Sequence, residues 1–145
     1  MNPESVRIAR ERFGLSLHWG SFYELERVVV GLFDVISMHH VYEHVLHPGS
    51  FLEYLKKFLV EDGAVLVSVP NILSDDFLRK GASWEYIHIP GHISYFSPHS
   101  LLRVFSLMGF KQEFITSFPA PGQSEGEGLV GLYRFAGCDH SEGKL

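Results

Sequence analysis

The sequence predicts an α/β fold in which a mostly parallel sheet ends in a C-terminal antiparallel pair of strands. Residues 33–70 follow the order strand, helix, strand, which is typical of two parallel strands joined by a right-handed crossover. Another amphipathic helix is predicted at 97–109. Two strand-like segments, 110–118 and 129–137, then follow with only a loop between them, and this order favours an antiparallel pair.

The chain begins with the pattern of a capped helix. Asn2 is a suitable N-cap, Pro3 suits the first helical position, and Gly14 is the kind of residue at which helices end. The next segment, "LSLHW" at 15–19, alternates apolar and polar side chains, so we expect a short strand there.

The middle of the chain supplies the two parallel strands. Residues 33–38 are largely apolar, as in a strand that is covered on both faces, and Pro48 then opens a helix. Residues 61–63, "EDG", predict a turn, and residues 64–70 predict the second buried strand. The apolar stripe of the intervening helix comprises Phe51, Leu52, Leu55, Phe58 and Leu59.

The remaining segments set the expected domain boundaries. Residues 71–81 predict a short helix, and 82–96 are irregular and rich in aromatic residues and histidine. The glycine-rich segment 119–128 predicts a flexible loop, and 138–145 form a polar tail. With 46% hydrophobic and 20% charged residues, the chain has a globular composition, so we expect a single domain at 1–137 followed by the tail.

Charge and cysteine content exclude several classes of protein. The net charge is −5, and the 12 lysines and arginines are scattered among 17 acids without a basic stripe, which argues against nucleic-acid and membrane partners. No apolar run has membrane-spanning length, and the charged N-terminus is not a signal peptide. The single cysteine, Cys138, cannot form an internal disulfide, and we expect a cytoplasmic protein.

Three segments in this order resemble class I S-adenosylmethionine-dependent methyltransferases, and most of all the branch with ubiquinone-biosynthesis and sugar methyltransferases. "NPESVRIARERFGL" at 2–15 resembles the helix after the second strand of that family. "FDVISMHHVYEHVLHPGSFLEYLKKFLVEDGAVLVSVPN" at 33–71 is similar to its fourth strand, following helix and fifth strand. "HIPGHISYFSPHSLLRVFSLMGF" at 88–110 resembles a later segment of the same fold.

The resemblance implies a partial Rossmann-like fold, S-adenosylmethionine as cofactor and methyl transfer to a small-molecule acceptor. Ligands of such sheets lie outside the carboxyl ends of the strands, where Met38, His39 and His40 are expected. In the family this strand end approaches the methionine part of the cofactor. Ser21 and Phe22 fall where relatives meet the adenine, although many relatives carry an acid near Ser21.

Two family motifs have no counterpart in the sequence. They are the glycine-rich turn after the first strand and the carboxylate that ends the second strand. We therefore expect the chain to correspond to the C-terminal part of the domain and its methyl transfer to be impaired. The strand at 33–38 would then lie at an exposed sheet edge, through which two copies could pair as a homodimer. A non-catalytic remnant, acting as an assembly or regulatory module, is the alternative.

The histidine-rich stretch after this strand leaves a second alternative, a zinc-binding protein. His40 to His44 spell H-x-x-E-H, a zinc-protease signature that requires one continuous helix and a third distant ligand. Here a strand runs directly into the motif and Pro48 begins a separate helix, so zinc binding through His40 and His44 is disfavoured. We expect Glu43 and His44 to be structural residues near the site, and we assign no metal ligand.

His92 is the predicted catalytic residue. Methyl transfer is an in-line displacement for which a protein mainly supplies orientation, sometimes with a base for the nucleophile. His92 lies in the aromatic segment after the second buried strand and could face the acceptor; the alternative is a packed histidine bonded to the backbone. The aromatic residues that could line an acceptor pocket, or simply belong to the core, are Trp84, Tyr86, Tyr95 and Phe96.

Overall fold

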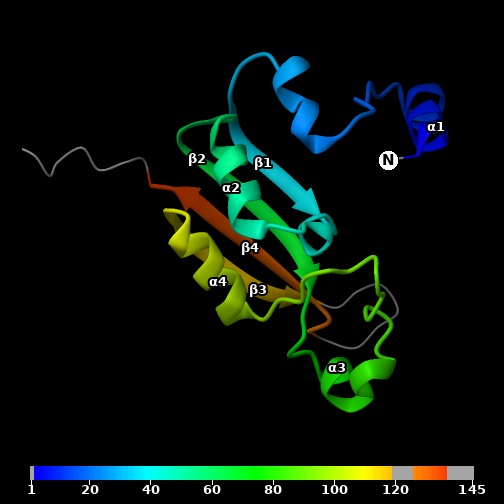
Figure 1. Ribbon diagram of the computed structural model, residues 1–145, viewed down its shortest axis with the longest axis vertical. Helices are drawn as coiled ribbons and strands as arrows, with labels where there is room; N and C mark the ends of the chain where they lie inside the picture. The colour runs from blue at the N-terminus through cyan, green and yellow to red at the C-terminus, as the bar shows by residue number, and fades with distance from the viewer. Residues whose placement is uncertain (1, 119–125, 137–145) are drawn as a thin grey trace, which may run out of the picture. The chain divides into compact units, whose positions relative to one another are not determined.

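The computed structural model describes residues 2–118 and 126–136. The chain divides into two compact units, Met1–Gly31 and Leu32–Leu145 (Figure 1). The predicted boundary between a domain ending at residue 137 and a polar tail falls outside the described residues, and so does most of the predicted loop at 119–128. No helix in the described part of the chain is both long and apolar enough to cross a bilayer.

The first unit contains helix α1 (Pro3–Phe13) and the 3₁₀ helix η1 (Phe22–Arg27). The predicted caps of α1 are confirmed, because the Asn2 side chain accepts the Glu4 N–H at 3.0 Å and Gly14 adopts a φ of 65°. The predicted strand at 15–19 is wrong, since these residues have no regular structure. A strand needs a neighbour for its backbone hydrogen bonds, and no strand is described between residues 2 and 31.

The second unit is built on a four-stranded sheet with the order β1-β2-β4-β3. Its strands are β1 (Phe33–His39), β2 (Leu59–Pro70), β3 (Phe110–Phe118) and β4 (Gly128–Phe135). β1 pairs with β2 in parallel, whereas β4 pairs antiparallel with both β2 and β3. The predicted antiparallel pair at the C-terminus is therefore confirmed, but a mostly parallel sheet is wrong. The hairpin of β3 and β4 docks beside β2, which makes two of the pairings antiparallel.

Two helices cover one face of this sheet, α2 (Pro48–Lys56) and α4 (Pro98–Leu107), as Figure 1 shows. Short elements complete the unit: η2 (Tyr42–His44), α3 (Asp75–Lys80) and η3 (Gly81–Ser83). The α4 cap is a reciprocal pair of hydrogen bonds between Ser97 and Ser100, and Ser74 caps α3. α2 and α4 thus begin at the predicted prolines, whereas α3 begins at Asp75, four residues after the start of the predicted segment.

The boundary between α2 and β2 differs from the prediction. α2 ends at Lys56, so Phe58 and Leu59 are buried as expected but lie outside the helix. The predicted turn at 61–63 is an irregularity inside β2, where Phe33 pairs with Leu59 but Val35 pairs with Ala64. The extra residues on β2 form a bulge that keeps the strand continuous.

The core between the helices and the sheet is largely aromatic. The ring of Phe105 in α4 lies 3.9 Å from that of Tyr133 in β4, and the Tyr42 ring lies 5.1 Å from that of Phe96. Burial raises the pKa of both tyrosines above the ordinary range, and the proximity of Tyr133 raises that of Tyr42 further. Tyr42 is the first residue of η2. Its burial in this core therefore holds the segment that follows β1.

Candidate functional site

The site is built at the carboxyl end of β1, where the chain turns away from the sheet. Met38 is buried, while His39 and His40 are exposed. His40 adopts a left-handed φ of 50°, which is uncommon for a residue with a Cβ, and it directly follows the last residue of β1. The chain then enters η2, and this places Glu43 and His44 beside the strand end.

Glu43 is held from both its backbone and its side chain. Its carbonyl oxygen accepts the N–H groups of Ile93 at 2.9 Å and Ser94 at 3.0 Å, which ties η2 to the aromatic segment before α4. Its side chain is 1% exposed, and Oε1 lies 2.9 Å from Nδ1 of His40. The second oxygen, Oε2, is buried and has no hydrogen-bond partner in the described part of the chain. An unpaired buried oxygen costs about 1–3 kcal/mol, and a bound ligand, cation or water that contacts it offsets this cost.

Two imidazoles lie beside this carboxyl group, and each is bonded to a backbone carbonyl through Nδ1. Nδ1 of His44 is 2.7 Å from the Gly91 carbonyl oxygen, and Nδ1 of His92 is 2.7 Å from the Tyr86 carbonyl oxygen. A carbonyl can only accept, so each Nδ1 carries the proton and donates it. In the neutral imidazole the lone pair then lies on Nε2, which is the atom left to bind a ligand or accept a proton.

Glu43, His44 and His92 form what we call the imidazole–carboxylate cluster. One potential ligand atom from each residue lies within 4.8 Å of the other two. Two imidazoles and one carboxylate are a common ligand set for a divalent transition-metal ion. The two carbonyl contacts are the outer-shell bonds that typically orient such ligands. The unpaired Oε2 and the two free lone pairs therefore fit a bound cation.

Aromatic side chains form one wall of the cluster. The Tyr86 ring lies nearly parallel to two imidazole rings. Its centroid is 6.0 Å from that of the His40 ring and 6.3 Å from that of the His92 ring. Trp84 is fully buried with its ring 5.0 Å from that of Tyr86. Of the predicted aromatic residues, Trp84 and Phe96 belong to the core, and Tyr86 contacts the site histidines.

The structure brings four of the predicted site residues together, His40, Glu43, His44 and His92. The H-x-x-E-H motif spans a strand end and a 3₁₀ turn instead of one helix, as expected from the interpretation that disfavours a zinc protease. The backbone bond expected of a packed His92 exists, and it engages Nδ1 rather than Nε2. The sequence did not connect His92 with Glu43 and His44, since these residues are distant along the chain and no local spacing joins them.

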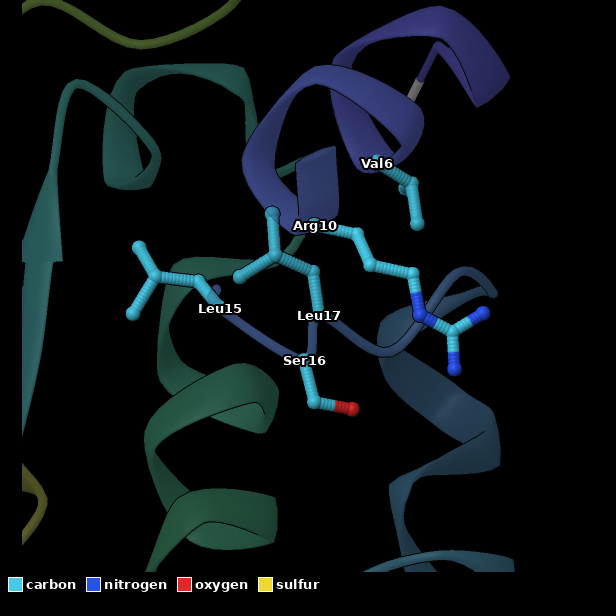
Figure 2. A pocket seen from close by; sticks show the side chains of 5 residues that line it. All are labelled: Val6, Arg10, Leu15, Ser16 and Leu17. Atoms are coloured by element: carbon cyan, nitrogen blue, oxygen red, sulfur yellow. The ribbon is translucent and has the colours of Figure 1, made fainter. Parts of the chain in front are cut away.

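Ser21 and Phe22 belong to the first unit, where the Ser21 N–H donates to the Glu24 carboxylate at 2.9 Å. Their cofactor contacts stay a prediction. The same unit contains a pocket of about 170 Å³, formed by α1 and the segment that follows it (Figure 2). Its lining residues are Val6, Arg10, Leu15, Ser16 and Leu17. It contains no histidine, acid or other group suited to proton transfer.

A second hollow, of about 270 Å³, lies at the carboxyl end of β2, where the sheet of an α/β protein typically receives ligands. It is lined by Asn71, Leu73, Pro98, Ile115, Thr116, Ser117 and Leu129. These groups can accommodate a ligand but supply no acid or base, so the imidazole–carboxylate cluster is the better candidate for chemistry.

Comparison with known proteins gives a family match over most of the chain. Residues 8–113 match the family described as "Methyltransferase domain". A search of curated protein sequences gives no match.

Solved structures of methyltransferases share the fold. A protein from Thermotoga maritima, described as a "SAM-dependent methyltransferase, possible histamine N-methyltransferase", has a TM-score of 0.65 at 20% identity, covering 92% of this chain and 70% of its own. A SAM-dependent methyltransferase from Archaeoglobus fulgidus gives 0.67 at 13% identity, with coverages of 92% and 72%. The N-methyltransferase NodS from Bradyrhizobium japonicum, in complex with S-adenosyl-L-homocysteine, gives 0.60 at 16% identity, with coverages of 92% and 63%. At these identities the likeness shows a shared Rossmann-like fold.

Proposed function

Because this chain belongs to the S-adenosylmethionine-dependent methyltransferase domain family, we propose that it transfers a methyl group to a small-molecule acceptor at the carboxyl end of β1. The imidazole–carboxylate cluster is the observation that carries this proposal. It gathers a buried carboxylate and two oriented imidazoles, one exposed and one half-buried, at the edge of the sheet where the fold binds ligands. We place the cofactor contacts at Met38, His39 and His40, and Ser21 and Phe22 stay predicted contacts of the adenine.

The acceptor is a group that must lose a proton to react, such as a hydroxyl. Its heteroatom forms a bond to the methyl carbon as the carbon–sulfur bond of the sulfonium breaks, and the electron pair stays on sulfur in S-adenosylhomocysteine. The acceptor proton leaves to a base. Holding the acceptor in line with the methyl group supplies most of the rate acceleration in such a displacement.

Glu43, His44 and His92 would hold a divalent cation, and their mixed nitrogen and oxygen set favours manganese, cobalt or zinc over calcium. When bound, such a cation lowers the pKa of a coordinated hydroxyl or water. In this arrangement His92 orients a ligand through Nε2 while the Tyr86 carbonyl fixes its ring. Without a cation, the same Nε2 would serve as the general base.

Transfer of the tritiated methyl group of S-adenosylmethionine to a panel of phenols, diols, amines and thiols tests this proposal. The assay is run with manganese or with a chelator, on the protein and on the variants His92→Ala and His47→Ala. His47 is the matched control, because it is exposed before α2 and its side chain makes no cap hydrogen bond. We expect transfer that requires manganese, is lost in His92→Ala and is kept in His47→Ala. Transfer that survives chelation but not His92→Ala would assign His92 as the base instead.

Cofactor placement is tested independently of the acceptor. Ultraviolet irradiation with tritiated S-adenosylmethionine at millimolar concentration, followed by peptide mapping, should label the peptide that contains residues 38–44. Label confined to the hairpin of β3 and β4 would contradict the placement at the end of β1.

A non-catalytic assembly module is the second candidate, and the exposure of β1 supports it. β1 has one neighbouring strand among the described residues, and Phe33 and Val35 are 44% and 54% exposed. An apolar strand edge of this kind is a surface for pairing with another chain.

A further inference from the structure

A second buried carboxylate, Glu127, lies outside the imidazole–carboxylate cluster. It is 1% exposed and stands directly before β4. Its Oε2 accepts the indole N–H of Trp84 at 3.0 Å, and its Oε1 has no hydrogen-bond partner among residues 2–118 and 126–136. Its backbone carbonyl accepts the Asn71 N–H at 2.8 Å, while the Asn71 side-chain amide donates to the Gly126 carbonyl at 3.0 Å. Glu127 is therefore anchored to the end of β2.

The Glu127 carboxylate fixes the orientation of the Trp84 ring. Trp84 is 1% exposed, and the Phe77 ring packs edge-on against it at 5.3 Å. A tryptophan N–H can be satisfied by any backbone carbonyl, whereas burying a carboxylate costs several kcal/mol unless its contacts offset that cost. Accepting the hydrogen bond of one indole N–H therefore does not by itself account for a buried carboxylate at this position.

The contacts continue from Trp84 to the site. The Trp84 ring lies 5.0 Å from the Tyr86 ring, and the Tyr86 ring is within 7° of parallel to that of His40 and within 14° of parallel to that of His92. The Tyr86 carbonyl oxygen also lies 2.7 Å from Nδ1 of His92. Tyr86 thus contacts two of the three histidines near Glu43, His40 by its ring and His92 by its ring and its backbone.

We propose that Glu127 is a positioning residue, which acts through Trp84 and Tyr86 to set the orientation of the His40 and His92 rings. Its role in methyl transfer rests on the function proposed above, but the orientation itself can be measured without that function. Glu127 touches neither the cluster nor any reacting atom. Its effect passes through the buried Trp84 ring to the half-buried rings of Tyr86 and His92.

The proposal is tested with paired substitutions that remove or keep each contact. Glu127→Leu removes the acceptor of the Trp84 N–H, and Glu127→Gln keeps a carbonyl acceptor there. Tyr86→Leu removes the ring, and Tyr86→Phe keeps it. The first readout is the nitrogen-15 spectrum of the imidazoles, which distinguishes the Nδ1–H from the Nε2–H tautomer. The second is titration with Co²⁺, followed by its visible absorption.

We expect the His92 signals to report a single Nδ1–H tautomer in the unmodified protein and in Glu127→Gln and Tyr86→Phe. In Glu127→Leu and Tyr86→Leu they should report a mixture of tautomers, and Co²⁺ affinity should fall about tenfold, as for the loss of other outer-shell partners. Unchanged His92 signals and unchanged Co²⁺ affinity in a folded Glu127→Leu would overturn the proposal.

Two controls keep the outcome interpretable. If Glu127→Leu does not fold by circular dichroism, Trp84→Phe replaces it, because phenylalanine keeps a ring but lacks the N–H that Glu127 binds. Mixed His92 tautomers in Trp84→Phe support the proposal, and unchanged His92 signals overturn it. If the unmodified protein binds no Co²⁺, the proposed cation chemistry fails, while the tautomer comparison still decides the role of Glu127.

Discussion

Replacing the buried carboxylate of the cluster should separate its chemical role from its structural one. Glu43→Met keeps an unbranched side chain of similar length and removes both carboxylate oxygens, so no large cavity is expected. If Glu43 holds a cation, the variant should lose cation binding without losing stability. If Glu43 is purely structural, the variant should lose stability whether or not a cation is present.

The magnitudes follow from the contacts of the two oxygens. Removing the unpaired Oε2 relieves about 1–3 kcal/mol. Removing Oε1 breaks the contact with His40, whose side chain is 46% exposed, and such a half-exposed pair contributes about 0–1 kcal/mol. The free energy of unfolding without cation should therefore stay equal or rise by up to about 3 kcal/mol. In the unmodified protein, a cation at 100 times its dissociation constant should add about 2.7 kcal/mol, and in Glu43→Met almost nothing.

Urea unfolding with and without manganese measures both quantities, with a chelator in the cation-free samples. The cation-free protein should still fold, because three ligands at a partly exposed position do not make the closed four-ligand set of a structural metal site. A loss of more than about 2 kcal/mol in cation-free Glu43→Met, together with an unchanged manganese effect, would refute the reasoning and show that Glu43 is structural.

Five further outcomes are expected. Tyr133→Phe should stabilise the protein by about 1 kcal/mol, because the buried Tyr133 hydroxyl has no hydrogen-bond partner in the described part of the chain; destabilisation in thermal melts would contradict this. Burial raises the pKa of Tyr133, so the phenol stays protonated in the folded state at a pH where the unfolded chain ionises. The free energy of unfolding should therefore be constant below the ordinary tyrosine pKa of about 10 and should fall as the pH rises above it. In Tyr133→Phe this fall should be less steep. His40→Ala should weaken S-adenosylmethionine binding more than His47→Ala, and equal affinities in calorimetry would count against the site at the end of β1. The chain as printed, which has no glycine-rich turn between a strand and a helix in its sequence, should bind S-adenosylmethionine with a dissociation constant well above 1 μM, and a tighter value would show that the motif is dispensable. β1 should pair edge to edge with β1 of a second copy, so light scattering should report a dimer, and a stable monomer at high micromolar concentration would exclude this pairing.

Local sequence predicted the elements whose signals are themselves local. Asn2 and Ser97 mark helix starts because each side chain bonds a backbone N–H within three residues. The strand predicted at 110–118 is confirmed with the same boundaries as β3. The segment at 15–19 has an equally good alternating pattern, but alternation becomes a strand only where another strand supplies hydrogen bonds.

The direction and order of the strands depend on contacts that no local pattern contains. The βαβ pattern at 33–70 fixed the parallel pairing of β1 with β2, and the short loop fixed that of β3 with β4. The position of β4 beside β2 is set by packing, where Tyr133 stacks on Phe105 of α4. The same distinction holds within the site. The position of His40 could be predicted because it lies at a strand end. The proximity of His92 and Tyr86 to Glu43 could not, because it depends on tertiary contacts.

The double attachment of Glu43 determines how its substitutions can be interpreted. The aromatic segment that carries His92 is bound to the Glu43 backbone, through the N–H groups of Ile93 and Ser94, and not to its side chain. The His92 ring is oriented by the Tyr86 carbonyl, which a change at Glu43 also leaves in place. Removing the Glu43 carboxylate therefore keeps both contacts that hold His92 near η2. A loss of cation binding or methyl transfer in Glu43→Met consequently reports on the carboxylate itself, and the tautomer of His92 in that variant provides the check, since it should remain Nδ1–H.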